Sequence, residues 1–266
     1  MHPLKPRLYD DSLRYKHITE SLPPGILGEV HCHSMYELIY LVSGDVTHGI
    51  EGRQYHLHPG DLVIIQPAKY HFLRIDSTAP YERYNILFDP QLHRISAVDR
   101  LETGLEVLNL SGNPMAADIF HRLDYYYDQA DRQTFEEVFR LALNELLINL
   151  SLSVSTPIRE EGILSPVVEQ ALAYINANLF SISGVEEVAA ALFISPSYLF
   201  HLFRNCLHQS PKRYINDKRL LVARQRIREG ERPTVVCKEC GFREYSNFYR
   251  SYCSFFGHAP SEEVHI

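Results

Sequence analysis

Residues 15–90 alternate short runs of β-forming residues with turn residues. Residues 62–65 form a continuous apolar run, and residues 37–42, 46–50, 55–58 and 84–88 form similar runs. A Gly or Pro lies within two residues of the end of each run. Short strands spaced by about 8 to 12 residues and separated by turn signals are typical of a small β-sandwich or barrel.

A different period governs residues 115–153. Apolar residues there recur at steps of three and four, which predicts an amphipathic helix entered at Asp131 or Thr134. Residues 116–128 are expected to form a partner helix, and its Tyr125, Tyr126 and Tyr127 place aromatic rings on several faces. These rings fit either core packing or a subunit interface. The repeating positions are Phe135, Val138, Phe139, Ala142, Leu143, Leu146, Leu147 and Leu150.

Helical patterns continue from residue 165 to the end of the chain. The polar segment 153–164 is expected to be a linker, because it is bounded by Pro and Gly and is rich in Ser and Thr. Beyond it, a short helix near residues 185–192 stops before a second helix that begins at Ser195-Pro196. A short helix, a tight turn and a second helix constitute a helix-turn-helix.

The second helix of this unit has the composition expected of a DNA recognition helix. Its apolar face leaves small polar, aromatic and basic groups outside, where they can meet base edges and phosphates. Phe200 is open to two interpretations, contact with a thymine methyl group or packing on its neighbours. The predicted DNA-binding residues here are Ser197, Tyr198, Phe200, His201 and Arg204.

The pattern returns about 48 residues later, with a turn at residues 241–243. A helix over residues 211–228 separates the two units, and its length of about 27 Å suits recognition helices that enter successive major grooves about 34 Å apart. The predicted DNA-binding residues of the second unit are Tyr245, Ser246, Asn247, Tyr249 and Arg250.

Charge is segregated along the chain. Residues 1–155 hold 13 Lys and Arg against 21 Asp and Glu, whereas residues 204–250 hold 12 against 5. The basic excess predicts phosphate contacts, although any single arginine there can instead belong to a solvated helix face. The basic residues of the connecting helix are Lys212, Arg213, Lys218, Arg219, Arg224, Arg226 and Arg228.

Composition narrows the class of protein. The 266 residues are 45% hydrophobic, without an apolar run long enough to cross a bilayer and without a signal-peptide pattern at the start. We therefore expect a cytoplasmic protein without membrane contact. Five irregularly spaced cysteines fit a reducing compartment. The Cys237–Cys240 pair is expected in the core, because a zinc site needs four ligands.

The C-terminal sequence resembles that of AraC/XylS-type transcription regulators. The resemblance covers about 100 residues and rests on residues 185–204 and, more diagnostically, on residues 240–248 and 255–261. It implies double-stranded promoter DNA as partner, a homodimer, and activation more often than repression. His208 stands where the family usually has Gly, and His accepts a left-handed helix cap better than most residues.

The N-terminal half resembles the cupin motifs. His31, His33 and Glu37 lie between Gly25 and Gly44 as in the first motif, and His71 follows Gly60 as in the second, with Ala68 replacing the usual Gly. In a strand, His31 and His33 would point to one face. These four residues could bind Fe, Mn, Ni or Zn, line a metal-free effector pocket, or serve structure alone. Tyr36 and Tyr40 are further pocket candidates, whereas His48, His56 and His58 are expected at the surface or pocket rim.

The predicted organisation is therefore a cupin-like effector-binding barrel over residues 1–110, a helical dimerisation segment over 111–152, a linker over 153–164, and an all-α double helix-turn-helix domain over 165–266. It predicts a non-enzymatic, DNA-binding transcription regulator that responds to a small-molecule effector. The resemblance suggests that this effector is a sugar. No cofactor is expected beyond the metal alternative. The rival hypotheses are a metal-dependent cupin enzyme fused to a DNA-binding domain and an architectural DNA binder.

Overall fold

The computed structural model describes residues 8–10, 13–25, 28–91, 94–100, 106–152 and 165–263. The chain divides into two compact units, residues 1–162 and 163–266. The predicted linker, residues 153–164, lies outside the described residues. Within the described part, no helix has the length and hydropathy needed to span a bilayer.

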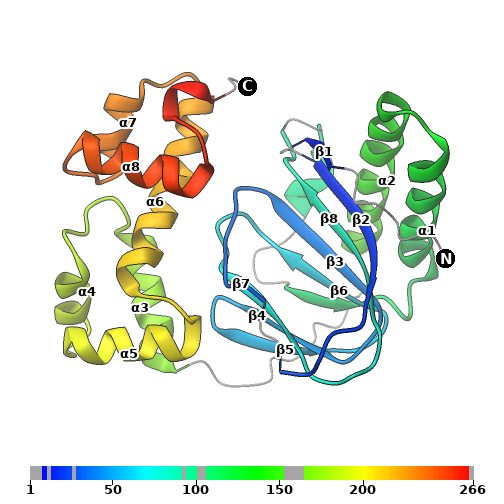
Figure 1. Ribbon diagram of the computed structural model, residues 1–266, viewed down its shortest axis with the longest axis horizontal. Coiled ribbons are helices and arrows are strands. Elements are labelled where there is room, and N and C mark those ends of the chain that lie inside the picture. The colour runs from blue at the N-terminus through cyan, green and yellow to red at the C-terminus, as the bar shows by residue number, and fades with distance from the viewer. Residues whose placement is uncertain are drawn as a thin grey trace. The chain divides into compact units, whose positions relative to one another are not determined.

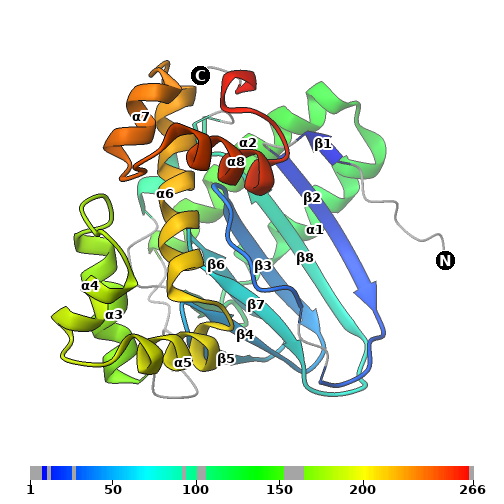
Figure 2. The same ribbon diagram turned by 60° about the vertical axis from the view of Figure 1, so that its left-hand side comes forward.

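The first unit is built on two β-sheets, which Figures 1 and 2 show from two directions. The larger has six strands in the order β1-β2-β8-β3-β6-β9, and the smaller has three in the order β5-β4-β7. All strand pairs are antiparallel. The strands are β1 Leu8–Asp10, β2 Leu13–Glu20, β3 Tyr36–Ser43, β4 Val46–Ile50, β5 Arg53–Leu57, β6 Asp61–Ile65, β7 His71–Ile75, β8 Tyr81–Phe88 and β9 Val107–Asn109.

The two sheets face each other across an apolar core. Ile39, Leu41 and Val63 from the larger sheet pack with Val46 and Ile50 from the smaller one. We call the sheet surfaces that meet here the inner faces. The predicted β-rich class is confirmed, although β1, β2, β7 and β9 were not predicted. In β2, LRYKHITE, the charged Arg14 and Lys16 alternate with apolar residues, and in β7, HFLRI, Arg74 interrupts the apolar run.

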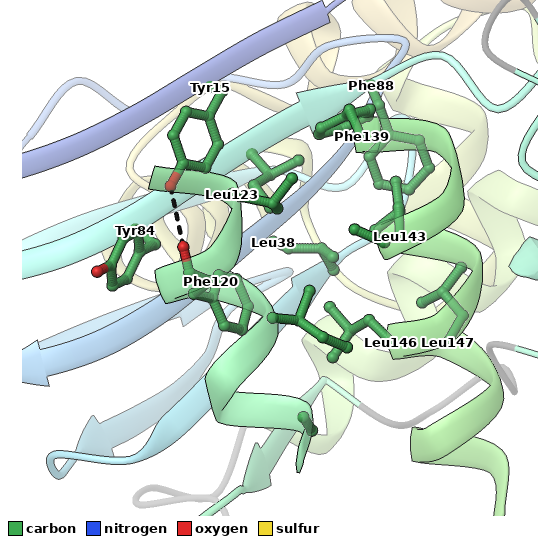
Figure 3. Close-up of a cluster of buried hydrophobic side chains, with 14 of the residues drawn as sticks. Tyr15, Leu38, Tyr84, Phe88, Phe120, Leu123, Phe139, Leu143, Leu146 and Leu147 are labelled. Atoms are coloured by element: carbon green, nitrogen blue, oxygen red, sulfur yellow. Dashed lines mark hydrogen bonds between the residues drawn. The ribbon is translucent and has the colours of Figure 1, made fainter. Parts of the chain in front are cut away.

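Two helices cover the outer face of the larger sheet. They are α1 Pro114–Gln129 and α2 Arg132–Leu152, and the cap predicted at Asp131 accepts a hydrogen bond from the Thr134 amide. Figure 3 shows the apolar side chains between these helices and the sheet, together with the bond that the Tyr15 hydroxyl donates to the Phe120 carbonyl. This second core accounts for the burial of Leu13, Tyr15, Leu38, Ile86 and Phe88.

The helical pair also has apolar residues that its own unit does not cover. Met115 and Tyr125 on α1, and Leu141, Ile148 and Leu152 on α2, are exposed. The three α2 positions lie on one helix face, because they are spaced by seven and four residues. Of the tyrosine triplet, Tyr127 alone is buried.

The second unit is entirely helical. A 3₁₀ turn over Pro260–Glu262 follows six α-helices: α3 Pro166–Ala177, α4 Val185–Ala191, α5 Pro196–Leu207, α6 Pro211–Arg228, α7 Pro233–Glu239 and α8 Tyr245–Phe256. Helices α4 and α5 form the first helix-turn-helix and α7 and α8 the second, with α6 between them (Figure 1). The Ser195 and Ser210 side chains cap α5 and α6, as their Ser-Pro sequences suggest.

One arginine joins the two helix-turn-helix units. The Arg219 guanidinium, on α6, donates to the carbonyls of Leu179 at 2.8 Å, Ile182 at 2.6 Å and Gly241 at 2.9 Å. The first two carbonyls precede α4, and the third belongs to the turn between α7 and α8. Arg219 therefore ties both units to the connecting helix, and its role is structural.

Candidate functional site

The first recognition helix presents the side chains expected of it. Leu199 and Phe203 are buried beneath α5, whereas the predicted contact residues are all exposed. The Arg204 guanidinium lies 5.9 Å from the centre of the Phe200 ring, one helical turn earlier. Phe200 thus supports Arg204, and it is also 44% exposed, so that its ring can still contact a base. The exposed set is Ser197, Tyr198, Phe200, His201 and Arg204.

The second recognition helix repeats this arrangement. Phe248 and Tyr252 are buried beneath α8 at the positions that Leu199 and Phe203 occupy in α5. The Arg250 guanidinium donates to the Asn247 side-chain oxygen at 2.6 Å. This bond orients a guanidinium whose other N–H groups can donate to guanine or phosphate. The predicted residues Tyr245, Ser246, Asn247, Tyr249 and Arg250 are all exposed.

The connecting helix does not supply the basic surface that its sequence suggests. Arg213 pairs with Asp217, Arg224 with Glu263, and Arg226 with Glu231 and Glu239. Arg219 bonds to carbonyls, and Lys218 and Arg228 are buried. For most of these residues the structure instead favours a role within the unit, through ion pairs, carbonyl contacts or burial. Most of these charges are neutralised or buried within the unit, whereas Lys212 and Arg213 are exposed.

The two cysteines of the second unit are part of its core. Cys237 and Cys240 are buried with Leu220, Val236 and Phe248, and burial raises the pKa of both thiols. No His or carboxylate joins them in a metal-binding group among the described residues. The predicted core role fits this environment.

The first unit brings four candidate ligands together between its sheets. Ligand atoms of His31, His33, Glu37 and His71 all lie within 4.8 Å of one another. Glu37 begins the inner face of β3, His71 begins β7, and the two histidines precede β3. The expected strand at residues 31–33 is wrong, because His31 makes only an isolated bridge to His71. That bridge nevertheless brings His31 to the cluster.

The backbone determines which ring nitrogen of each histidine carries hydrogen. The Nδ1 atoms of His31, His33 and His71 lie 2.8, 3.0 and 2.9 Å from the carbonyl oxygens of Glu29, Met35 and Lys69. A carbonyl only accepts, so each Nδ1 is the donor. Each neutral ring then directs the Nε2 lone pair away from its carbonyl, which is the tautomer found in metal-binding histidines.

The Nε2 atoms of His33 and His71 converge on one carboxylate. Glu37 Oε2 lies 2.9 Å from His33 Nε2 and 3.1 Å from His71 Nε2, and Asn85 Nδ2 donates to Glu37 Oε1 at 2.5 Å. Burial alone would raise the pKa of Glu37, but hydrogen bonds from His33 and His71, when these rings are protonated at Nε2, hold it well below its usual range. Partial desolvation and the neighbouring His71 lower the pKa of His31. An ionised carboxylate among three imidazoles is a donor set for a divalent transition metal.

Two predictions about neighbouring residues are wrong. Tyr36 and Tyr40 do not line this cluster, because alternate residues of β3 point to opposite faces. Tyr40 stacks on Phe120 of α1 at 4.7 Å, and Tyr36 stacks on Phe88. His48 is not at the rim, because it is fully buried on the inner face of β4 between Val46 and Ile50. By contrast, His56 is half-buried and His58 is exposed.

Several inner-face residues were not predicted from the sequence. Asn85 contacts Glu37 directly, and Tyr81 and Arg83 precede it on the same face of β8. Their alternation with Glu82, Tyr84 and Ile86 was the available signal, but it cannot be assigned to a face without the pairing of β8 to β3.

Comparisons with known proteins agree with this division of the chain. The sequence model of an AraC-like ligand binding domain matches residues 25–150, and that of a helix-turn-helix domain matches residues 188–264. The "XylDLEGF operon transcriptional activator 3" of Pseudomonas putida is 25% identical over 250 residues, covering 86% of this chain and 72% of that protein. The "HTH-type transcriptional regulator GbdR" of Pseudomonas aeruginosa is 32% identical over 103 residues. That match covers 38% of this chain and 28% of GbdR.

Solved structures give weaker similarities. ToxT of Vibrio cholerae matches 95% of this chain and 97% of its own, with 12% identity and a TM-score of 0.40. A probable AraC family transcriptional regulator of Rhodopseudomonas palustris is 31% identical over 38% of this chain and 95% of its own, with a TM-score of 0.34. The ligand-binding model matches residues of the first unit, and the helix-turn-helix model matches residues of the second. The chain belongs to the AraC/XylS-type transcription regulators.

Proposed function

We propose that this chain binds specific sites in double-stranded DNA and regulates transcription in response to a small molecule held between its β-sheets. The observation that carries the proposal is the pair of exposed recognition faces on α5 and α8 within one helical unit. The Pseudomonas putida relative is named an operon transcriptional activator, which supports activation as the direction of control.

Selection of bound sequences from a random DNA pool tests this proposal. The full chain should enrich a site with two contact regions about one helical turn apart. His201→Ala should relax the preference in one region and Arg250→Ala in the other. Equal affinity for the enriched site and for unrelated DNA at physiological salt would contradict sequence-specific binding.

The homodimer belongs to the same proposal. Leu141, Ile148 and Leu152 form an exposed apolar stripe on α2, a pattern typical of helices that pair with a partner. Sedimentation should show a dimer for the wild-type chain and a monomer for Ile148→Glu. Thr78→Glu, which adds the same charge at an exposed bend of the same unit, serves as the control. A wild-type monomer at micromolar concentration would contradict the dimer.

We further propose that the three histidines and Glu37 hold a divalent transition metal. The support is the hydrogen-bonded Nδ1 of each ring, which leaves three Nε2 lone pairs and one carboxylate to meet a cation. The chain purified without chelator should carry about one equivalent of metal. His33→Ala should lose it, whereas His58→Ala should keep it. Failure to take up Co(II) after reconstitution would contradict the metal site.

The same donor set is the one observation that favours a metal-dependent enzyme. A regulator releases its effector unchanged, whereas an enzyme alters it. Mass spectrometry of the small molecule recovered after prolonged incubation with the metal-loaded chain separates the two functions. The sugar effector stays a prediction from the resemblance alone.

A further inference from the structure

Beside the histidine cluster, the inner face of the larger sheet carries cations where an apolar core would be expected. Asn85 points to this face, because it bonds to Glu37. Lys16 pairs directly with Asn85, and Ile18 pairs with Arg83, so that Lys16 and Arg83 point to the same side. The opposite face of β2 and β8 is buried beneath α1, whereas Lys16, Arg83 and Asn85 are half-buried.

These cations are incompletely neutralised. Arg83 donates to Glu20 at 3.2 Å and lies 4.4 Å above the Tyr81 ring, which leaves most of its N–H groups for another acceptor. Within the described residues, the Lys16 ammonium makes no ion pair or hydrogen bond. The nearby carboxylate of Glu37 already accepts from Asn85 and contacts two histidines.

Two buried polar side chains on the same inner faces also lack hydrogen-bond partners within the described residues. Neither ring nitrogen of His48 nor the Tyr81 hydroxyl has a hydrogen-bond partner in the described part of the chain. Both residues are almost completely buried, and such unpaired groups are rare because burial removes the hydrogen bonds that water would supply. Burial, reinforced by the charge of His71, lowers the pKa of His48 to about 3, so that the ring is neutral.

The unmatched groups are therefore mainly donors and positive charges. Lys16, Arg83, Tyr81 and the N–H of His48 all seek an acceptor. A carboxylate supplies two acceptor oxygens and one negative charge, and bonds to charged groups are the strongest of this kind. An uncharged sugar would satisfy the hydrogen bonds but would leave the cations without a counter-charge.

We propose that the inner face of β2 and β8, beside the three histidines, binds the carboxylate of a small organic acid. This inference rests on the proposed function, because it names the chemical class of the effector. The carboxylate lies against Lys16 and Arg83, with Tyr81 and His48 as neutral partners. A metal at the histidines would add positive charge to the same region.

Calorimetric titration of the full chain with matched acids and amides tests the inference. Acetate, butyrate and cyclohexanecarboxylate are each compared with the corresponding primary amide, which keeps the shape and removes the charge. At least one acid should bind about tenfold or more tightly than its amide. Equal binding of acid and amide, or binding of none of the acids, would overturn the carboxylate site.

Substitutions locate the site and separate it from the DNA function. Lys16→Met and Arg83→Met should each weaken acid binding about tenfold or more, Lys16→Arg should largely restore it, and Lys238→Met, an exposed change of equal charge, should have no effect. Unchanged acid binding in Lys16→Met overturns the inference. If the chain binds none of the acids but still binds the selected DNA, only the carboxylate site is contradicted. If the chain binds an acid but shows no specific DNA binding, only the proposed DNA-binding regulator is contradicted.

Discussion

The two helix-turn-helix units share one helical frame but differ at the positions that require a left-handed backbone. In the second unit, Gly241 and Gly257 follow α7 and α8 with φ of 81° each. In the first unit, Phe193 and His208 follow α4 and α5 with φ of 56° and 54°. The same turn is thus made with glycine in one unit and with bulky residues in the other.

Packing explains why only one unit needs glycine at the turn. A Cβ on Gly241 would lie 2.6 Å from the Phe180 carbonyl oxygen and 2.8 Å from the Arg219 guanidinium carbon. The Phe193 side chain is 97% exposed, so that nothing restricts its size. The difference shows that glycine is demanded here by close approach of the backbone, since left-handed strain alone costs only about 1–2 kcal/mol.

The largest expected effect comes from the residue that joins the units. Arg219→Met removes three hydrogen bonds and strands three carbonyls, so it should lower the free energy of unfolding by at least about 3 kcal/mol. Urea unfolding followed by helical circular dichroism measures this. Arg232→Met, at an exposed arginine, should cost less than about 0.5 kcal/mol. Equal costs would show that the clamp contributes no stability.

Gly241→Ala should be the next most damaging change. Left-handed strain together with the clash at Phe180 should cost about 2–3 kcal/mol. Gly257→Ala is the matched control, because a Cβ there meets no atom within 4 Å and only the strain of about 1 kcal/mol applies. If both substitutions cost the same, close approach is not what retains Gly241.

Arg250→Ala should weaken binding to the selected DNA by about 1–3 kcal/mol if the guanidinium contacts a base. Asn247 holds that guanidinium in place, so Asn247→Ala should weaken binding less and in the same region of the site. Electrophoretic mobility shifts at fixed salt measure both. Arg132→Ala, in the first unit, removes the same charge and should leave the affinity unchanged. Binding by Arg250→Ala at wild-type affinity would remove the residue from the interface.

The smallest expected effect has the opposite sign. Phe193→Gly relieves left-handed strain, although it increases the entropy of the unfolded chain, so the net gain should be about 0.5–1 kcal/mol. Thermal unfolding at one pH detects it as a rise in Tm. A loss of stability would mean that the exposed ring contributes packing which its 97% exposure does not suggest.

The second unit could be predicted from sequence more fully than the first. Its helices are defined by interactions between residues close in sequence, namely Ser-Pro caps and buried residues at helical spacing. Such buried residues are Leu199, Phe203, Phe248 and Tyr252. The partners of Arg219 and Arg224 could not be predicted, because the Gly241 carbonyl and Glu263 are distant in sequence. Their charge therefore resembled a phosphate-binding surface.

In the first unit, the candidate ligands were predictable but their surroundings were not. The spacing of His31, His33, Glu37 and His71 identified the cluster without a correct strand at residues 31–33. The face on which Tyr40 or His48 lies depends on strand register, and a shift of one residue reverses every side chain. Register is set by pairing between strands far apart in sequence, such as β2 with β8.

Strand β8 contributes side chains both to the space between the two sheets and to the contacts with helix α1. Arg83 and Asn85 point between the sheets, while Glu82 and Tyr84, on the other side of the same backbone, bond to His17, His121 and Asp124. His17 also bonds to Asp124 of α1 at 2.6 Å. A ligand bound between the sheets that displaced β8 would therefore also move Glu82 and Tyr84, and with them their contacts to His17 and to α1, across the thickness of a single sheet. Strand β8 itself would then transmit the displacement, without a relay of side chains.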